Sequence, residues 1–337
     1  MSTTNYNEAA ARLKKLGDDI FGTKPSPEVV NILATDTYRK SFSAFLRGEP
    51  VTDSLKVGHA GGGGYLVPTE FEKRLIEGLT EENVLRKISH IIQSDHDRII
   101  PVSMERGVSY FVNEGDPIPE SDEKFGQVKM GAFKMATRTK ISDELLEDSF
   151  FDVESYIAEH FADRFGKMEQ DAFINGDGVG KPLGLLHTAP VGAETADSDS
   201  INIDNMLELR YSLKGGYRKN AVWLMHECIM NKVRKAYNTD GRNFWGIYSE
   251  DPTIFTLMGH PVYFCDSMPY SLVPGEKVVL FGDFDYFWIA DRGKQSFKRQ
   301  NELYSETGQV GFSASRRVDG KLIVPEAISA LQVKEKK

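Results

Sequence analysis

The chain has 337 residues, of which 40% are hydrophobic, and its 41 basic and 50 acidic residues give a formal net charge of −9. This length can bury one large core or two modest ones, and the negative charge argues against a protein that grips nucleic acid by neutralising phosphates. No apolar run approaches the ~18 residues of a membrane helix, and the start lacks the basic and apolar regions of a signal peptide, so the cytosol is the expected compartment.

Residues 1–56 form a separate helical unit in this interpretation. Two apolar stripes recur there at helical spacing. They comprise Ala9, Leu13, Leu16 and Ile20, and then Tyr38, Phe42, Phe45 and Leu46. Helices this short bury little by themselves, so we expect them to pack on a partner. A hinge of four glycines follows at Gly61, Gly62, Gly63 and Gly64, where the backbone is almost unrestrained.

An arm and a strand-rich region come next. A helix is predicted from Glu70 to Leu79, and a strand from Val108 to Val112. From Phe133 to Ile141 apolar and polar residues alternate, which predicts a strand with one polar face. Between the strands lies the acidic, proline-stiffened segment Asn113–Lys124, either a solvated loop or an arm that lies on a neighbouring subunit.

A long amphipathic helix is predicted at 152–174, with Asp152 as its N-cap. Its apolar stripe is Val153, Tyr156, Ile157, Phe161, Phe165, Met168 and Ala172. At ~1.5 Å per residue it would extend ~33 Å, which suits a spine that supports a thin subunit.

The glycine-rich segment Asn175–Leu185 follows this helix and could be mistaken for a phosphate loop. Gly180 and Lys181 are followed by Pro182, where such a loop needs Ser or Thr, and the segment follows a helix instead of a strand. The glycine spacing of dinucleotide-binding folds fails too. We interpret the segment as a helix terminator, in which Asn175 and Gly176 allow a left-handed turn.

Other catalytic signals are absent from the sequence. Met230 stands where a zinc helix that begins His226-Glu227 would need a second histidine. Cys228 and Cys265 are too few for a disulfide framework, so both are expected to be reduced core residues. We therefore expect no catalytic, cofactor-binding or metal-binding residues.

The remaining sequence alternates helices and strands, which indicates an α+β protein. Helices are expected at Leu207–Leu213 and Ile229–Tyr237. Strands are expected at Val222–Met225, Pro261–Phe264, Val278–Phe281 and from Phe287 to Ile289.

In the order of its features the chain resembles the major capsid proteins of tailed double-stranded DNA bacteriophages, whose fold is named for phage Hong Kong 97. The resemblance covers roughly residues 36 to 333. Its motifs are Gly62–Pro68, Pro119–Asp122, the spine helix running into Asn175–Gly178, then Pro182–Leu185, Leu257–Val262 and Gly282–Phe284. No single motif is decisive, but their joint order is specific.

The resemblance implies a domain plan. Residues 1–56 would be scaffold-like, 57–82 an N-terminal arm, 83–105 peripheral domain, 106–132 an extended loop, 133–195 peripheral domain with the spine helix, 196–295 axial domain, 296–325 peripheral domain, and 326–337 a strand returning to the axial domain. Copies of the chain would join as hexamers and pentamers and close an icosahedral shell in the host bacterial cytoplasm. The packaged DNA would be held without tight specific binding.

A scaffold, a maturation protease and a portal are further partners that the resemblance implies. Two alternatives remain: an encapsulin shell, which encloses cargo enzymes, and an enzyme that binds phosphate at Gly176–Lys181. Nucleic acid in purified particles separates the phage shell from the encapsulin, and a Lys181→Ala variant with a nucleotide-binding assay tests the enzyme.

The chain departs from the family pattern in two places. Some members join a lysine before the Pro-Glu-Ser-Asp motif to a neighbour's asparagine, with help from a glutamate. Here these positions hold Ile118 and, by rough alignment, Gly308 and Ser315, so no isopeptide bond is expected. The N-terminal helical unit is also short; cleavage near residues 50–60 is possible, and intact subunits in mature particles would exclude it.

Without covalent links, ionic contacts are expected to hold neighbouring subunits. The acidic partners would be Glu114, Asp116, Glu120, Asp122 and Glu123 in the extended loop. The basic partners would be Lys134, Arg138, Arg316 and Arg317 on the neighbour. Single exposed pairs contribute only ~0–1 kcal/mol, so many repeated contacts would be needed.

Overall fold

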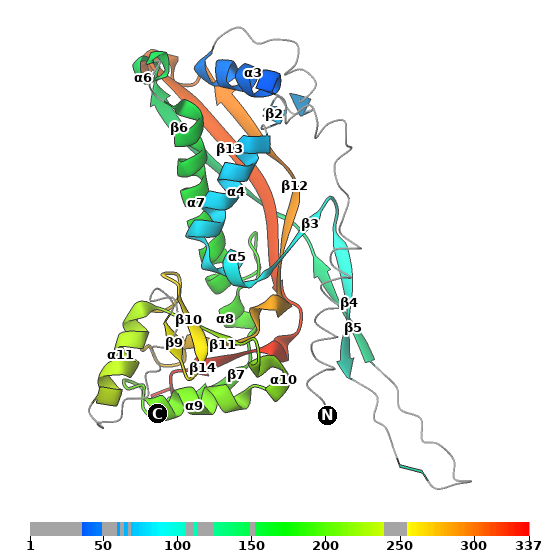
Figure 1. Cartoon of the computed structure of the whole chain (residues 1–337), viewed down its shortest axis with the longest axis vertical. Helices are drawn as coiled ribbons and strands as arrows, with labels where there is room; N and C mark the ends of the chain where they lie inside the picture. The colour runs from blue at the N-terminus through cyan, green and yellow to red at the C-terminus, as the bar shows by residue number, and fades with distance from the viewer. Residues whose placement is uncertain are drawn as a thin grey trace.

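The computed structural model describes residues 36–48, 59–60, 64–66, 69–105, 111–112, 124–148, 152–238 and 255–336. Within these residues the chain forms an elongated α+β body with a long and a small sheet of six strands each and a two-stranded hairpin (Figure 1). None of the helices described there is both long enough and apolar enough to span a bilayer.

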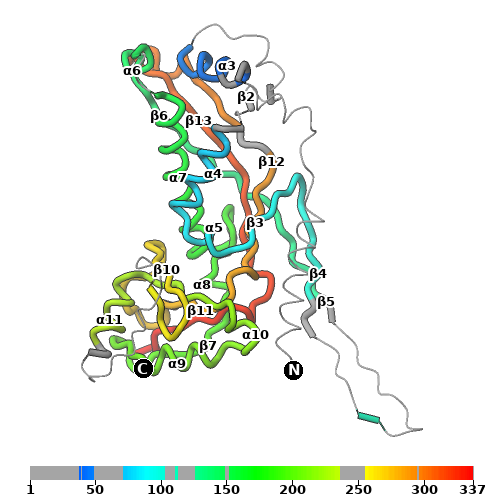
Figure 2. The backbone as a smooth tube through the Cα atoms, in the orientation of Figure 1, coloured from blue at the N-terminus to red at the C-terminus, as the bar shows by residue number. Residues whose placement is uncertain are grey.

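The long sheet is built around two 14-residue strands that run side by side for most of the body (Figure 2). Its strands are β1 (His59–Ala60), β2 (Gly64–Leu66), β3 (His90–Ser94), β6 (Phe133–Ser142), β12 (Phe287–Gln300) and β13 (Gln309–Leu322). The register of β12 against β13 shifts between Arg292 and Ser296, next to Gly293, whose φ of 62° is left-handed. Before this bulge β12 pairs with β3, and after it with β2.

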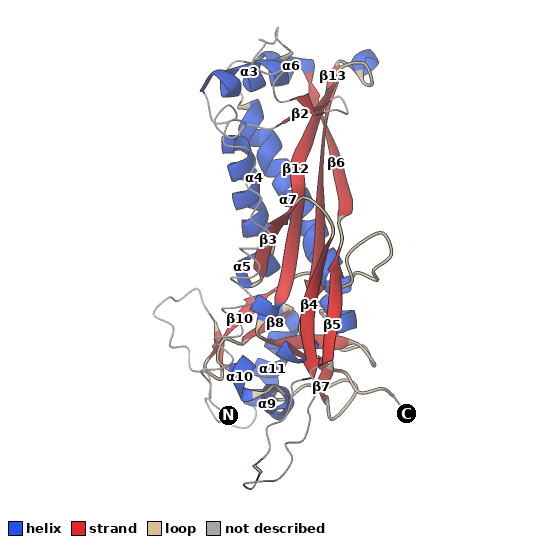
Figure 3. Ribbon diagram, turned by 90° about the vertical axis from the view of Figure 1, so that its right-hand side faces the viewer, coloured by secondary structure: helices blue, strands red, loops and turns tan. Residues whose placement is uncertain are grey.

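The spine helix α7 (Val153–Asn175) covers one face of the long sheet together with α4 (Thr69–Glu82) (Figure 3). Its predicted N-cap is confirmed, since the Asp152 carboxylate accepts a hydrogen bond from the Ser155 amide at 3.1 Å. The predicted stripe is buried except at Tyr156, which is half-buried, and Met168, which is 54% exposed. Met168 was wrongly placed because the buried face turns toward Glu169 at this point.

Close packing seats these two helices against each other and against the sheet. A Cβ atom on Gly78 of α4 would lie 2.8 Å from the Ala162 Cβ of α7. A Cβ atom on Gly320 of β13 would lie 2.6 Å from the ring of Phe173. Real Cβ contacts are almost never this short, so both positions need glycine.

Helix α3 (Asp36–Arg47) packs on the body of its own chain. Tyr38, Phe42 and Leu46 are fully buried, and the Phe42 ring lies 5.5 Å from Phe71 and 5.7 Å from Phe297. The expectation that this helix packs on a partner is therefore wrong, because its aromatic stripe completes the core beside α4 and β12. The stripe from Ala9 to Ile20 lies outside the described residues.

The small sheet lies at the other end of the body. Its order is β7 (Val191–Glu194), β14 (Ile328–Gln332), β11 (Lys277–Gly282), β8 (Val222–Met225), β10 (His260–Phe264) and β9 (Thr256–Leu257). Its helices are α9 (Ile203–Ser212), α10 (Gly215–Arg218) and α11 (Glu227–Asn238). The last strand returns to this sheet as expected, between β7 and β11.

Of the two cysteines predicted to be core residues, one is buried near this sheet and one is not. Trp223 is fully buried, and its ring lies 4.1 Å from Phe281. Cys265 is buried, and that burial raises the pKa of its thiol to about 11. Cys228 is exposed at the start of α11, so its placement in the core was wrong.

The remaining elements join the two sheets and form the hairpin. They are α5 (Val84–Ile88), β4 (Arg98–Glu105), β5 (Lys124–Met130), α6 (Asp143–Glu147), α8 (Leu185–Thr188) and the short 3-10 turns Phe284–Tyr286, Ser305–Thr307 and Pro325–Ala327. The expected strand at Val108–Val112 falls partly outside the described residues, and Phe111 and Val112 are not in a strand. The predicted boundary at residue 295 lies within β12, which belongs wholly to the long sheet.

Candidate functional site

The glycine-rich segment after α7 is a closed turn. Gly176 has φ −61° and ψ 140°, so the left-handed turn predicted at Asn175 and Gly176 is wrong. Glycine is required at 176 because a Cβ atom would lie 2.0 Å from the Pro182 carbonyl oxygen. The Gly184 amide closes the turn by donating to the Gly176 carbonyl at 2.8 Å.

Lys181, the one lysine of this turn, pairs with a carboxylate of the same turn. The Lys181 Nζ atom lies 3.9 Å from the Asp177 carboxylate, which also accepts a hydrogen bond from the Val179 amide at 3.0 Å. A phosphate group would therefore meet a carboxylate beside this lysine. In the described part of the chain, no group of three or more His, Cys, Asp or Glu side chains is placed to hold a metal ion.

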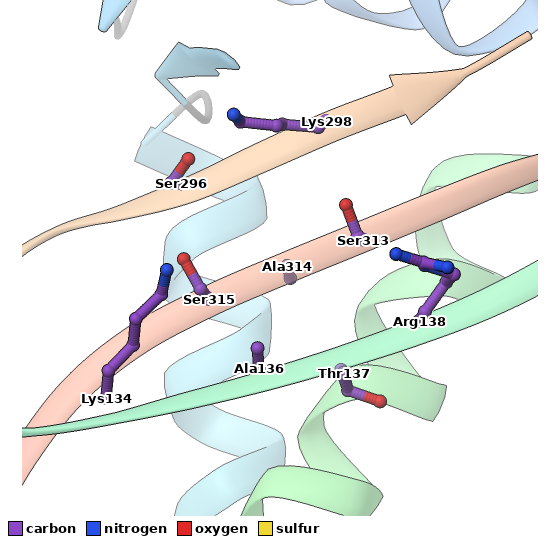
Figure 4. Close-up of a pocket in the computed structure, with 9 residues that line it drawn as sticks. All are labelled: Lys134, Ala136, Thr137, Arg138, Ser296, Lys298, Ser313, Ala314 and Ser315. Carbon is purple, nitrogen blue, oxygen red and sulfur yellow. The ribbon is translucent and has the colours of Figure 1, made fainter. Parts of the chain in front are cut away.

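The open face of the long sheet carries a cationic groove of about 410 Å³. It is lined by Lys134, Ala136, Thr137, Arg138, Ser296, Lys298, Ser313, Ala314 and Ser315 (Figure 4). Strand register explains how these residues meet. Arg138 of β6 stands opposite Ser313 of β13, which stands opposite Lys298 of β12. A second row joins Ala136, Ser315 and Ser296 in the same way.

The cationic groove is suited to an anionic partner. Three positive side chains and three serine hydroxyls line it, and no carboxylate of the described residues is among the lining groups. The Arg138 guanidinium is steadied by the Tyr304 hydroxyl at 3.5 Å. Small serine and alanine side chains along the floor leave room for an extended segment between the longer cations.

The hairpin arm, formed by β4 and β5, lies to the right of the lower half of the body in Figure 1. Its base is fixed by polar contacts to β13. The fully buried Asp319 carboxylate accepts a hydrogen bond from the Gly131 amide at 2.7 Å, and the Lys321 Nζ atom donates to the Lys129 carbonyl. Burial raises the pKa of Asp319, although the amides of Gly131 and Gly320 oppose that effect.

A small hydrophobic cluster supports the same base. It consists of Ile92, Ile100, Met130, Trp288, Ala290 and Ile323. These side chains come from β3, β4, β5, β12 and the residue that follows β13. The arm is therefore seated on the sheet by both polar contacts and apolar packing, and its direction is set by the body.

A buried ion network ties the spine to the sheet. The Arg86 guanidinium, fully buried on α5, lies 2.7 Å from the Glu169 carboxylate of α7 and 2.7 Å from the Asp291 carboxylate of β12. Arg316 of β13 contacts the same two carboxylates. Burial alone would raise the pKa of Asp291, but the charges and hydrogen bonds of the two arginines outweigh it and hold this pKa well below its usual range.

The structure separates the basic residues that the sequence predicts to meet a neighbour. Lys134 and Arg138 lie in the cationic groove, and Arg317 is exposed opposite Lys134 on β13. Arg316 points to the other face and is only 5% exposed, so its prediction as a contact for a neighbour is wrong. Its charge is already matched by Glu169 and Asp291.

The acidic partners and most of the hinge are not placed. Glu114, Asp116, Glu120, Asp122 and Glu123 lie outside the described residues, as do Gly61, Gly62 and Gly63. Gly64 begins β2. Sequence reasoning missed Lys298, although the alternation of Ser296, Phe297 and Lys298 gave the signal of a strand with one polar face.

A model of the phage capsid family matches residues 63–333 of the chain. The major capsid protein of Klebsiella oxytoca phage phiKO2 is 23% identical over 275 residues, which is 76% of this chain and 63% of that protein. The chain thus spans less than two thirds of this curated relative's length.

Solved structures give the same result for the fold. The capsid of a native GTA particle is 30% identical, with a TM-score of 0.65, over 74% of this chain and 89% of that one. The holo-SrpI encapsulin complex from Synechococcus elongatus matches with a TM-score of 0.54 at 13% identity, over 84% of this chain and 95% of that one.

Proposed function

Because the chain belongs to the phage capsid family and has the Hong Kong 97-type fold, we propose that it is the major capsid protein of a tailed phage. Its copies join as hexamers and pentamers and close an icosahedral shell around double-stranded DNA, in the host bacterial cytoplasm. The finished shell is the head of the virion. Its role is structural, and a scaffold, a maturation protease and a portal act with it during assembly.

The observation that supports this proposal is the combination of an arm and a cationic groove in one subunit. The hairpin arm stands out to the side of the body (Figure 1), and among the described residues no helix covers the sheet face that carries the cationic groove (Figure 3). A subunit that both offers and receives a contact can repeat it in every copy.

We propose that the cationic groove receives the acidic loop of a neighbour. The acids are the five loop residues from Glu114 to Glu123, and their partners are Lys134, Arg138, Lys298 and Arg317. Each exposed pair contributes ~0–1 kcal/mol, so the contact gains strength by repetition around each ring. It also weakens with salt, since exposed charges are screened over ~10 Å at ~0.1 M salt.

Electron microscopy of the overexpressed protein tests the proposed function. Closed shells, tubes or ring-shaped capsomers are expected. A protein that stays monomeric at high concentration contradicts the proposal.

A Lys134→Glu, Arg138→Glu double variant tests the groove and is expected to lower particle yield more at low salt than at high salt. Arg234→Glu, on the exposed side of α11, is the matched control with unchanged yield.

An encapsulin shell is the second candidate, because the Synechococcus elongatus complex shares the fold. At 13% identity that likeness concerns the fold alone. The long acidic loop and the glycine hinge favour the phage shell. Particles purified from infected or induced cells are expected to contain double-stranded DNA, and particles filled with a protein cargo and free of DNA would favour the encapsulin.

We further propose that α3 stays with the mature subunit. Cleavage near residues 50–60 followed by loss of the preceding segment would uncover Phe71 and Phe297, which now contact Phe42. Mass spectrometry of mature particles is expected to find the peptide that spans Asp36–Arg47. Its absence would contradict retention of the helix.

A further inference from the structure

Two arginines lie against one exposed tyrosine at the edge of the small sheet. The Arg210 Cζ atom is 5.4 Å and the Arg218 Cζ atom 5.6 Å from the centre of the Tyr211 ring. Tyr211 is 62% exposed, at the end of α9, and Arg218 ends α10. The ring holds both guanidinium groups in place through cation–π contacts. We call Arg210 and Arg218 the arginine pair.

The arginine pair has no acidic partner within the described part of the chain. The Nε atoms of both residues are buried without a hydrogen-bond partner there, and neither guanidinium is paired with a carboxylate. His260 lies beside them, with its Nδ1 atom 3.1 Å from the Ala221 carbonyl oxygen. Burial and then the positive charge of Arg210 and Arg218 lower the pKa of His260. Within the residues that the structure describes, the cluster is therefore a positive site without a paired carboxylate.

Exposed carboxylates gather at the opposite end of α9. This acidic end consists of Glu194, Asp197, Asp199 and Asp204. The helix dipole accounts for Asp204 in the first turn and Arg210 in the last. It does not account for Arg218, Asp197 or Asp199, which lie outside the helix. The ten residues of α9 separate the two ends by roughly 15 Å.

We propose that the arginine pair of one copy binds the acidic end of the next copy around each ring. This inference rests on the proposed assembly into rings, and it names the contact that joins neighbouring small-sheet domains. Helix α9 runs along the outer edge of this domain with α10 at one end, so its two ends face away from each other (Figure 1). A contact between unlike ends closes a ring when the rotation between copies is right.

The chemistry of the arginine pair favours a carboxylate partner. The planar guanidinium binds a carboxylate through two parallel hydrogen bonds, and Tyr211 already restricts the motion of the two side chains. Tyrosine and arginine are also the residues that dominate binding energy at protein interfaces. Duplex DNA is the less favoured occupant, because the chain as a whole carries a net charge of −9.

Two charge-reversal variants test the contact. The first carries Arg210→Glu and Arg218→Glu, and the second carries Glu194→Lys, Asp197→Lys, Asp199→Lys and Asp204→Lys, because all four carboxylates form the acidic end. Each variant alone places like charges in every contact, so at least a ten-fold loss of capsomers is expected by size-exclusion chromatography and electron microscopy. Arg234→Glu, with the same change of charge per site on α11, is expected to assemble like the unchanged protein.

An equal mixture of the two variants gives the sharpest result. In a hexamer whose copies alternate, every contact again joins opposite charges, so the mixture is expected to recover hexamers that neither variant forms alone. Pentamers cannot alternate and are not expected to recover. Recovery also shows that both variants fold.

The other outcomes overturn the inference. If the unchanged protein assembles and the variants assemble equally well, the contact is wrong while the proposed function stands. If neither variant assembles and the mixture fails as well, the pairing of these two ends is wrong. If the first variant assembles normally but its rings lose affinity for duplex DNA, the site belongs to nucleic acid. An unchanged protein that never assembles overturns both proposals.

Discussion

Single residues in this protein carry charge in places where water is excluded. Asp283, 5% exposed, caps the turn between β11 and β12 by accepting a hydrogen bond from the Asp285 amide at 3.1 Å. Burial raises its pKa to about 6. The folded state therefore binds a proton more tightly than the unfolded chain does, and this contribution to stability is lost as the pH rises from about 4 to about 6.

The Asp283→Asn variant has no carboxyl group to titrate at this position, so it does not lose this stability as the pH rises. The amide oxygen can still accept from the Asp285 N–H, so we expect the variant to raise the free energy of unfolding by ~1–3 kcal/mol near pH 7 and to leave it unchanged near pH 4. Urea unfolding of unassembled subunits at the two pH values measures the difference. An equal gain at both would show that the charge of Asp283 is not the cause.

Arg86 has the opposite role, because it neutralises buried acids. Arg86→Met leaves Glu169, which is fully buried, and Asp291 with one arginine between them. Breaking such a network from one side costs ~3–5 kcal/mol, which we expect as a loss of unfolding free energy. Arg234→Met on the exposed side of α11 is the control, with a change within ~0.5 kcal/mol. If Arg86→Met also changed the free energy of unfolding by no more than this, the proposed role of Arg86 would be contradicted.

The element scale shows what the sequence could and could not predict. Apolar spacing alone predicts four elements, because each of them buries one regular face. They are the spine helix α7, α4, α3 and β6. Strand β4 escaped prediction because its apolar residues do not alternate with polar ones. Ile99, which is 60% exposed, stands next to the buried Ile100, and Pro101 follows them. The cationic groove could not be derived either, because cross-strand register, which no local pattern encodes, places Lys298 across Ser313 from Arg138.

The packing of α3 gives a prediction at this scale. Phe42→Ala removes a fully buried ring that contacts Phe71 and Phe297, so we expect the free energy of unfolding of unassembled subunits to fall by ~3–5 kcal/mol. Lys40→Ala on the exposed side of the same helix is the control. If α3 docked only on a partner, the two variants would unfold alike.

At the scale of the whole molecule, we expect assembly to proceed without covalent links. Ile118 stands before the loop motif and has no amine to react, and Gly308 and Ser315 supply neither the amide nor the carboxylate. Denaturing gels of purified particles are therefore expected to show one monomer band. Ladders of multimers that persist after boiling would contradict this prediction.

The bulge in β12 has a mechanical consequence for such a shell. Strand β12 is locked to β3 on one side of Gly293 and to β2 on the other, while between Arg292 and Ser296 its register with β13 shifts. Bending concentrates where a ladder is interrupted, because the flanking segments resist it. One sequence that fills flat six-fold and sharper five-fold positions needs two curvatures, and we expect this point in the long sheet to absorb the difference.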